Sequence, residues 1–308
     1  MANGPARASG VASYASDSTS SFIPALWAAK LVQKFYATTV FGEIASIDYQ
    51  GLITGQGDKV TIRTRPTITI RDYVIGEGLK YEKPASPSVD LNIDKAKYFG
   101  FELNDVEEYQ ADINLMSEFT DDATEQMKTE IDTGILGDIY GDVDAANTGA
   151  TAGVKTGKYN MGSASDALSL TKATVLDWLV DVKGVLDEQK LPQTGRWLCI
   201  PSYIAGLIMK SDLRDASLTG DSQSPLRNGR IGNIAGLNIY ITDNLHTDGS
   251  GVTDVIAGHK AGLTFASQMT RMDNIANPSD FGNLVRGLNV YGYKVIEPKY
   301  LVHSVVTA

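Results

Sequence analysis

Residues 153–159, Gly-Val-Lys-Thr-Gly-Lys-Tyr, combine glycine and lysine in a way similar to phosphate-binding loops. In such a loop four residues separate the two glycines, a lysine reaches the phosphates, and the next Ser or Thr holds magnesium. Here only three residues separate Gly153 from Gly157, and Tyr159 stands where the hydroxyl ligand belongs. The pattern therefore favours a flexible Gly-Lys loop over a nucleotide site.

The acidic residues Asp138, Asp142 and Asp144 have part of the spacing of a calcium-binding loop. Calcium loops take several oxygen ligands and close with a Glu at the twelfth position. Ala146 occupies the place of the required third oxygen ligand, and no Glu closes a twelve-residue loop. We expect no calcium site here.

Histidine, cysteine and paired acids offer no catalytic arrangement either. The histidines lack a paired helical spacing or a cysteine cluster, which argues against zinc, and the single cysteine, Cys199, lies in an apolar run typical of a buried free thiol. Glu107 and Glu108 are adjacent, and adjacent helical residues point in different directions. We therefore expect no enzyme, no cofactor and no metal. The three histidines are His246, His259 and His303.

The elements that would position such residues form a mixed α/β unit in the second half of the chain. Apolar periodicity predicts helices over 171–186, 202–209 and 260–266, and strands over 197–200, 252–256 and 288–306. Gly229, Gly232 and Gly236 indicate turns open to positive φ. After them apolar and polar residues alternate over 237–242, which predicts a strand.

The first half of the chain predicts an extended hairpin and a long helix. Alternating residues flank a loop rich in Gly and Pro between 58 and 97. Because this hairpin has too few apolar residues for a core of its own, it must lie against something, and a partner subunit is one candidate. Apolar residues at helical spacing then predict a helix over 104–140, opened by a capping-box-like sequence.

Charge differs between these two elements. Residues 104–144 hold 13 acidic residues and one basic residue, Lys128, whereas residues 58–97 hold eight basic and six acidic residues. Complementary patches set register and partner choice although each exposed ion pair is weak. The alternative is that each is a solvated face.

Composition limits the classes of function. The chain has 308 residues and a net charge of −10, which argues against a protein that grips nucleic acid through a basic surface. Its first 21 residues are rich in Ala, Ser and Gly without an apolar block, so we expect a flexible arm rather than a signal or a membrane span.

The order of these elements resembles the major capsid proteins of tailed bacteriophages with the Hong Kong 97-type fold. Local sequence is similar too: Gly-Asn-Ile-Ala-Gly-Leu-Asn-Ile-Tyr at 232–240 with Thr-Asp-Asn-Leu at 242–245 looks like the family's segment of glycine, core strand and surface turn. Residues 259–265 and the ending at 290–298 also look like phage coat sequences. The resemblance spans nearly the whole chain.

The resemblance implies an α+β fold with four parts. They are an N-terminal arm at 1–35, a peripheral domain with the long spine helix at 36–57, 98–145 and 266–298, an extended loop at 58–97, and an axial α/β domain at 146–265 and 299–308. The extended loop would lie over a neighbouring subunit.

The function implied by the resemblance is that of a major capsid protein, which self-assembles into hexamers and pentamers of an icosahedral head enclosing double-stranded DNA. It implies a scaffolding protein and a portal as partners, allows a decoration protein, and places the chain in the virion after assembly in the host cytoplasm. We expect no sequence-specific DNA binding and no membrane. A nanocompartment shell protein of the same fold and, from another class, an acidic α/β hydrolase with unrecognised carboxylates are the alternatives.

Charged residues are the expected contacts between subunits. On the loop they would face the acidic spine of a neighbour, and after residue 226 they would make contacts in the axial domain. Some relatives crosslink a loop Lys to an Asn, but neither that Asn nor a catalytic Glu can be matched here, so Lys80 and Lys83 are expected to be exposed loop charges. The loop-to-spine residues are Arg63, Arg65, Arg71, Lys80, Lys83, Glu107, Glu108 and Asp112, and the axial residues are Arg227, Asn228 and Arg230.

Overall fold

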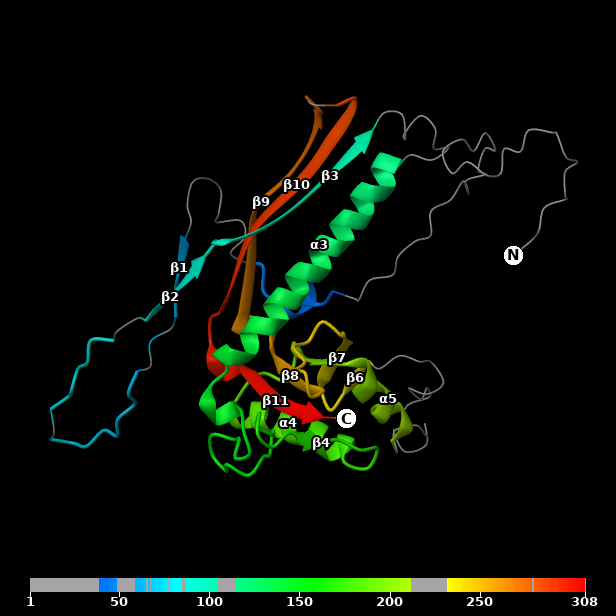
Figure 1. Ribbon diagram of the computed structural model, residues 1–308. Helices are drawn as coiled ribbons and strands as arrows, with labels where there is room; N and C mark the ends of the chain where they lie inside the picture. The colour runs from blue at the N-terminus through cyan, green and yellow to red at the C-terminus, as the bar shows by residue number, and fades with distance from the viewer. Residues whose placement is uncertain are drawn as a thin grey trace, which may run out of the picture.

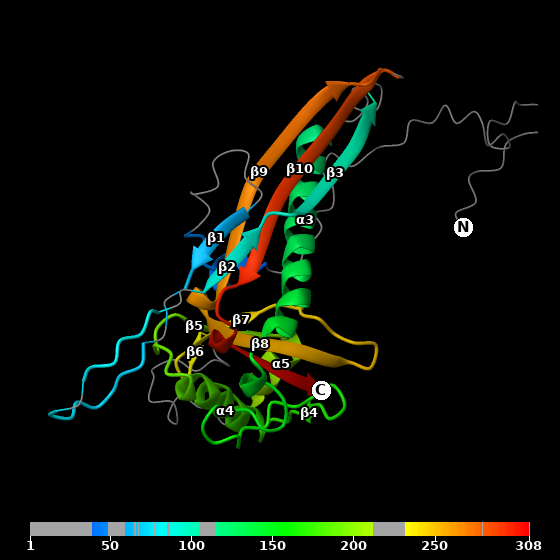
Figure 2. The same ribbon diagram turned by 90° about the vertical axis from the view of Figure 1, so that its left-hand side faces the viewer.

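The computed structural model describes residues 39–48, 59–64, 66, 68–76, 78–84, 87–104, 115–211, 232–278 and 280–307. Its elements form an elongated part around a three-stranded sheet and a broader part around a six-stranded sheet, and one long helix runs from the first to the second (Figure 1). Figure 2 shows the same two parts from the side, with an extended loop projecting away from both. The expected α+β class is confirmed.

The six-stranded sheet has the order β4-β11-β8-β5-β7-β6. Its central strand β5, Arg196–Ile200, is buried along its whole length, pairing in parallel with β7 and antiparallel with β8. Helices α4 (Val175–Glu188) and α5 (Ser202–Lys210) belong to the same unit. The other strands are β4 (Leu168–Ser169), β6 (Asn233–Ile234), β7 (Leu237–Ile241), β8 (Val252–His259) and β11 (Leu301–Thr307).

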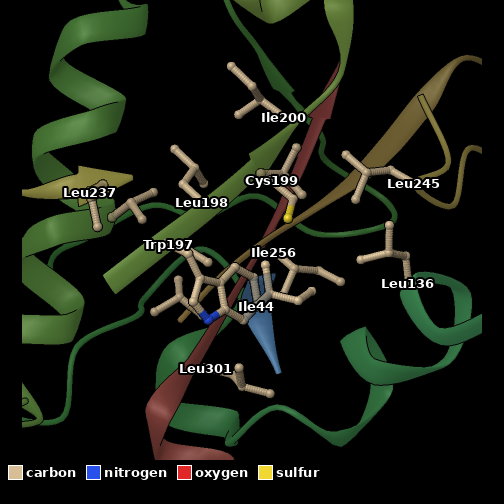
Figure 3. Close-up of a cluster of buried hydrophobic side chains, with 14 of the residues drawn as sticks. Ile44, Leu136, Trp197, Leu198, Cys199, Ile200, Leu237, Leu245, Ile256 and Leu301 are labelled. Carbon is tan, nitrogen blue, oxygen red and sulfur yellow. The ribbon is translucent and has the colours of Figure 1, made fainter. Parts of the chain in front are cut away.

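One large core holds this unit together. It includes apolar side chains of β5, β7, β8 and β11, the free thiol of Cys199, and Ile44 from the short helix α1, Phe41–Ile44 (Figure 3). Leu136 of the long helix belongs to it as well. Burial of these side chains is the main favourable term in folding, at roughly 1.5–3 kcal/mol each.

The three-stranded sheet has the antiparallel order β3-β10-β9, with β3 at Lys95–Asn104, β10 at Gly282–Val295 and β9 at Leu263–Ala276. The long helix α3, Leu115–Ile139, runs beside β3 and β10 (Figures 1 and 2). Only its last turns are buried, through Ile131, Ile135, Leu136 and Ile139. The carboxyl-terminal half of α3 is therefore part of the main core, whereas its amino-terminal half lies on the projecting sheet.

The predicted hairpin exists, but its paired part is short. Strands β1 (Lys59–Arg63) and β2 (Ser88–Asn92) pair over five residues each. Ile62, Leu91 and Ile93 form a small core with Ala266 of β9. The base of the hairpin thus packs against β9 of its own chain. Its apolar side chains at that end are buried by this contact. Short 3-10 helices complete the fold: η2 (Tyr140–Asp142), η3 (Ala145–Asn147), η5 (Lys260–Gly262) and η6 (Pro298–Tyr300).

The helix expected over 260–266 is wrong. Residues 263–266 belong to strand β9, which pairs with β10 from Leu263 onward. A short apolar run cannot be told from a buried helix by periodicity alone, and here long-range pairing decided it. The helix expected from residue 104 is also wrong at its start, because Asn104 still belongs to β3; residues 105–114 lie outside the described residues.

Two local expectations fail near the six-stranded sheet. Thr171 is not the residue that begins α4, because the helix starts at Val175 after an N-cap at Thr174. The expected surface turn at 242–245 is mostly buried: Thr242 is 2%, Asn244 7% and Leu245 6% exposed. The resemblance implied a surface turn, but the side chains of Thr242 and Asn244 have hydrogen-bond partners inside the protein.

Candidate functional site

The loop charges that were expected to contact a neighbouring subunit are exposed where the structure describes them. These are Arg63 on β1 and Lys80 and Lys83 in the loop. Arg71 lies 3.6 Å from a carboxylate oxygen of Glu82, so this pair joins the two sides of the loop. The remaining candidates lie outside the described residues: Arg65, Glu107, Glu108, Asp112, Arg227, Asn228 and Arg230.

A second property of the loop was missed from the sequence, namely its exposed apolar side chains. Ile70 is 90%, Ile75 88% and Tyr81 89% exposed. Large apolar side chains gathered on a projecting segment mark an interaction surface. The sequence did contain a signal for this surface. The residues between 68 and 81 include many β-branched and aromatic side chains, and the other side of the loop has no apolar run to cover them. The full set is Ile68, Ile70, Tyr73, Val74, Ile75, Leu79 and Tyr81.

Some of the basic residues in the range 58–97 form ion pairs with acidic residues of the long helix in the same chain. Lys97 Nζ lies 2.9 Å from Glu130 Oε1, and Lys95 Nζ lies 3.0 Å from Asp138 Oδ2. A hydrogen bond to Glu130 raises the pKa of Lys97. Hydrogen bonds from Tyr293 and then from Lys95 lower the pKa of Asp138, against the effect of partial burial. These lysines lie on β3, so they hold the spine helix on its own sheet.

The glycine-lysine loop at 153–159 binds a carboxylate of the same chain. Glu188 at the end of α4 accepts hydrogen bonds from the backbone N–H groups of Lys155 (2.7 Å) and Thr156 (3.2 Å) and from the Thr156 hydroxyl (2.7 Å). The Thr156 hydroxyl, followed by the backbone N–H of Lys155, lowers the pKa of Glu188. These donors of the loop are thus taken by Glu188.

The acids considered for calcium do not converge. Asp142 lies 3.3 Å from Lys294, Asp138 pairs with Lys95, and Asp144 accepts a hydrogen bond from the backbone of Ala146. Across the described part of the chain, no group of three or more His, Cys, Asp or Glu side chains is arranged to hold a metal ion.

Two histidines expected to be scattered meet at one carboxylate. His246 Nδ1 lies 2.6 Å from Asp254 Oδ2, and His303 Nε2 lies 2.7 Å from Asp254 Oδ1. Burial raises the pKa of Asp254, but the hydrogen bonds from His303 and His246 outweigh it and the net direction is down. The third, His259, lies elsewhere, with Nε2 at 3.0 Å from the Thr194 carbonyl. Sequence spacing could not show this, because the meeting depends on the pairing of β8 with β11.

A hydrolase would need two convergent acids in a concave pocket. A cavity of about 270 Å³ on the three-stranded sheet, lined by Tyr98 and Leu288 among others, contains Asp273 as its one acid. That carboxylate pairs with Arg271 at 3.0 Å and with Arg286 at 3.1 Å. This cavity gives no support to the hydrolase alternative.

Comparison with known protein families decides the identity. A family described as phage capsid protein matches residues 88–304. This chain belongs to the phage capsid protein family. The matched range covers β2, both sheets and the spine helix, so it includes the framework of the capsid chain and not one local motif. A search of curated proteins found no match.

Solved structures agree with this over nearly the whole capsid chain. A structure from Mycobacterium phage Che8 is 25% identical, with 92% of this chain and 97% of that chain covered and a TM-score of 0.75. The capsid of cyanophage P-SCSP1u is 12% identical, with 93% of each chain covered and a TM-score of 0.70. The capsid of a native GTA particle, solved with C5 symmetry, is 12% identical, with 93% and 96% covered and a TM-score of 0.64. The expected Hong Kong 97-type fold is confirmed.

The capsid chain is therefore a structural protein of the virion and not an enzyme. A capsid is a shell built from repeated subunits, so membership of the phage capsid protein family confirms the expected association of the chain with itself at this level. None of the helices in the described ranges is long and apolar enough to cross a membrane.

Proposed function

We propose that this capsid protein assembles into the hexamers and pentamers of an icosahedral head around double-stranded DNA, with its extended loop lying on a neighbouring subunit. The observation that carries the proposal is the exposed apolar surface of the loop. Such surface is costly in water and becomes favourable when a second copy covers it, at roughly 1.5–3 kcal/mol for each fully buried side chain.

The two sheets support the proposed division into parts, except that residues 263–265 of β9 fall within the proposed axial range. The peripheral domain comprises 36–57, 98–145 and 266–298, and the axial domain comprises 146–265 and 299–308. Strand memberships support this, because β3, β9 and β10 share one sheet and β11 returns to the other. The loop at 58–97 contacts other subunits in this proposal, and the arm at 1–35 lies outside the described residues.

Charged contacts supplement the apolar ones. Arg63, Lys80 and Lys83 are exposed in the loop and free to face acids of a neighbour's spine. Arg65, Glu107, Glu108 and Asp112 remain predicted members of this contact, and Arg227, Asn228 and Arg230 remain predicted axial contacts. A scaffolding protein, a portal and in some particles a decoration protein complete the assembly, and the net charge of −10 keeps packaged DNA from adhering to the wall.

A pair of double variants tests the role of the loop. Ile70→Asp with Ile75→Asp should leave the thermal unfolding of the subunit unchanged within about 0.5 kcal/mol, since both side chains are exposed, but should abolish shells in negative-stain images. The matched control is Val154→Asp with Val180→Asp, which changes two exposed apolar residues that are not part of the loop. Normal shells from the loop variant would refute the proposal.

A further inference from the structure

Residues 242–246 directly follow β7 in the sequence and contact the long spine helix α3; we call these residues the clasp. Each of the first three has a polar anchor. Thr242 donates its backbone N–H to the carbonyl of Ile200 at 3.0 Å, and Asp243 Oδ1 accepts from the backbone N–H of Ser202 at 2.9 Å. Asn244 donates its own backbone N–H to Thr242 Oγ1 at 3.2 Å. The clasp is thus rooted in the six-stranded sheet and at the start of α5.

The first contact of the clasp with α3 is made at Asp132. Asn244 Nδ2 donates to Asp132 Oδ2 at 2.8 Å, and Asp132 Oδ1 accepts from the backbone N–H groups of Val40 (3.1 Å) and Phe41 (2.9 Å). Asp132 is fully buried. Burial raises its pKa, while the hydrogen bonds from Asn244, Val40 and Phe41 act in the opposite direction. Because a buried carboxylate is costly without its donors, this contact is specific.

The second contact is made at Tyr140, directly after α3. The ring of Tyr140 stacks on His246 at 5.2 Å between centroids and lies 5.4 Å from the ring of His303. Asp254 orients both imidazoles, as described above, and Thr148 Oγ1 lies 3.1 Å from His303 Nδ1. Tyr140, at the end of the spine helix, therefore contacts both the ring of His246 in the clasp and the ring of His303 in β11.

The two contacts are separated along the helix. Asp132 and Tyr140 are eight residues apart, which is about 12 Å at 1.5 Å per residue. Between them, Leu245 and Leu136 belong to the same buried core (Figure 3). Apolar contacts are not directional, whereas the hydrogen bond at Asp132 and the ring stack at Tyr140, at different heights, fix both the tilt and the rotation of α3.

The part of α3 that precedes its buried residues, up to Glu130, is held differently. The ion pair of Lys97 with Glu130 is exposed, and Phe119, which is 39% exposed, makes an edge contact with Phe101 at 5.9 Å. Exposed ion pairs contribute little, about 0–1 kcal/mol. The carboxyl-terminal end of α3 is thus the stiff end, and its junction with the six-stranded sheet sets the direction of the projecting sheet.

We propose that the clasp is a conformational device that sets the angle between the spine helix and the six-stranded sheet, and that this angle determines which shell curvatures the subunit can adopt. The inference rests on the proposed assembly into hexamers and pentamers, where one chain must fit positions of different curvature. Weakening the clasp frees the angle without removing the apolar core beneath it.

Two variants test the device in the soluble subunit and in shells. Asn244→Ala removes the donor to Asp132, and His246→Gln removes the stacked ring at a side chain that is 43% exposed. In the soluble subunit, each should increase amide hydrogen exchange in residues 133–140 on the order of tenfold while leaving β9 and β10 unchanged. Asn233→Ala is the matched control, since Asn233 donates an exposed hydrogen bond to Asn238 of the same sheet.

In shells imaged by electron microscopy, the two variants should give a broader distribution of diameters than the parent and the control. Unchanged hydrogen exchange in both variants would overturn the clasp itself. Faster exchange with an unchanged distribution of diameters would overturn its link to curvature. If the parent chain forms no shells, the proposed function fails, and the exchange measurement still decides whether the clasp holds α3. If Asn244→Ala does not fold, His246→Gln alone decides both points.

Discussion

Arg196 Nη1 lies 2.7 Å from Asp187 Oδ1, which joins the first residue of β5 to the last turn of α4. Arg196 is 1% exposed, and its guanidinium also donates to the carbonyls of Pro192 and Leu191, at 2.7 Å each. The pKa of Asp187 is raised by burial but lowered more by Lys183 and Arg196, so its net direction is down. A buried cation satisfied in this way is a fixed part of the fold.

Arg196→Ala should lower the free energy of unfolding by roughly 3–5 kcal/mol, because it leaves the carbonyls of Leu191 and Pro192 without this donor and removes the buried one of the two cations that pair with Asp187. Lys183→Ala is the control: Lys183 pairs with the same Asp187 at 3.0 Å through a side chain that is 33% exposed, and its loss should cost about 0–1 kcal/mol. Urea unfolding of the subunit measures both. Equal losses would show that burial of Arg196 does not matter.

Acid should destabilise the subunit in part through Asp254. Its pKa is lowered in the folded state, so its contribution is fully present above the unfolded value of 3.8 and is lost as pH falls through the lower folded value. Asp254→Asn removes that contribution. The variant should therefore be less stable than the parent at pH 6 and approach it near pH 3, as followed by melting temperature. A constant difference between pH 6 and pH 3 would contradict the assignment.

Replacing each of two glycines by alanine should have opposite effects on the stability of the subunit. A Cβ at Gly292 of β10 would collide with the carbonyl oxygen of Asn92, where the hairpin approaches the sheet. Gly292→Ala should therefore destabilise by about 1–3 kcal/mol through overpacking. Gly134 lies in α3 with nothing within 4 Å of its Cβ position, so Gly134→Ala should stabilise by about 0.5–1 kcal/mol. Thermal unfolding of the two variants distinguishes the outcomes, and a shift in the same direction would refute the packing argument.

Charge reversals separate contacts within a subunit from contacts between subunits. Arg63→Glu with Lys80→Glu changes exposed loop charges and should impair assembly with little effect on unfolding. Lys95→Glu with Lys97→Glu instead places like charges against Asp138 and Glu130 of the same chain. This second variant should loosen α3 and lower the melting temperature by a few degrees. Shell yield and melting temperature are both measured for each; normal shell yield from the first variant would refute an interfacial role for those charges.

Elements with one-sided burial could be predicted from local periodicity. Alternation identified β1, β2 and β7, and helical spacing identified α4, α5 and the buried end of α3. The expectation failed where a segment is buried on several sides, as at 260–266, since a short apolar run fits both helix and strand. It also failed at 242–245, because polar residues with buried partners have the composition of a surface turn.

The sequence by itself determined the class of the molecule: no catalytic or metal constellation, an extended hairpin before a long acidic helix, and an α/β unit with the order of a phage capsid protein. Only the tertiary structure decided which residues act together. Lys97 with Glu130, Asn244 with Asp132, and His246 with His303 lie 33, 112 and 57 positions apart. Their contacts depend on strand pairing and helix placement, which bring distant parts of the chain together. Periodicity in the sequence indicates only which face of a local helix or strand is buried and which faces water.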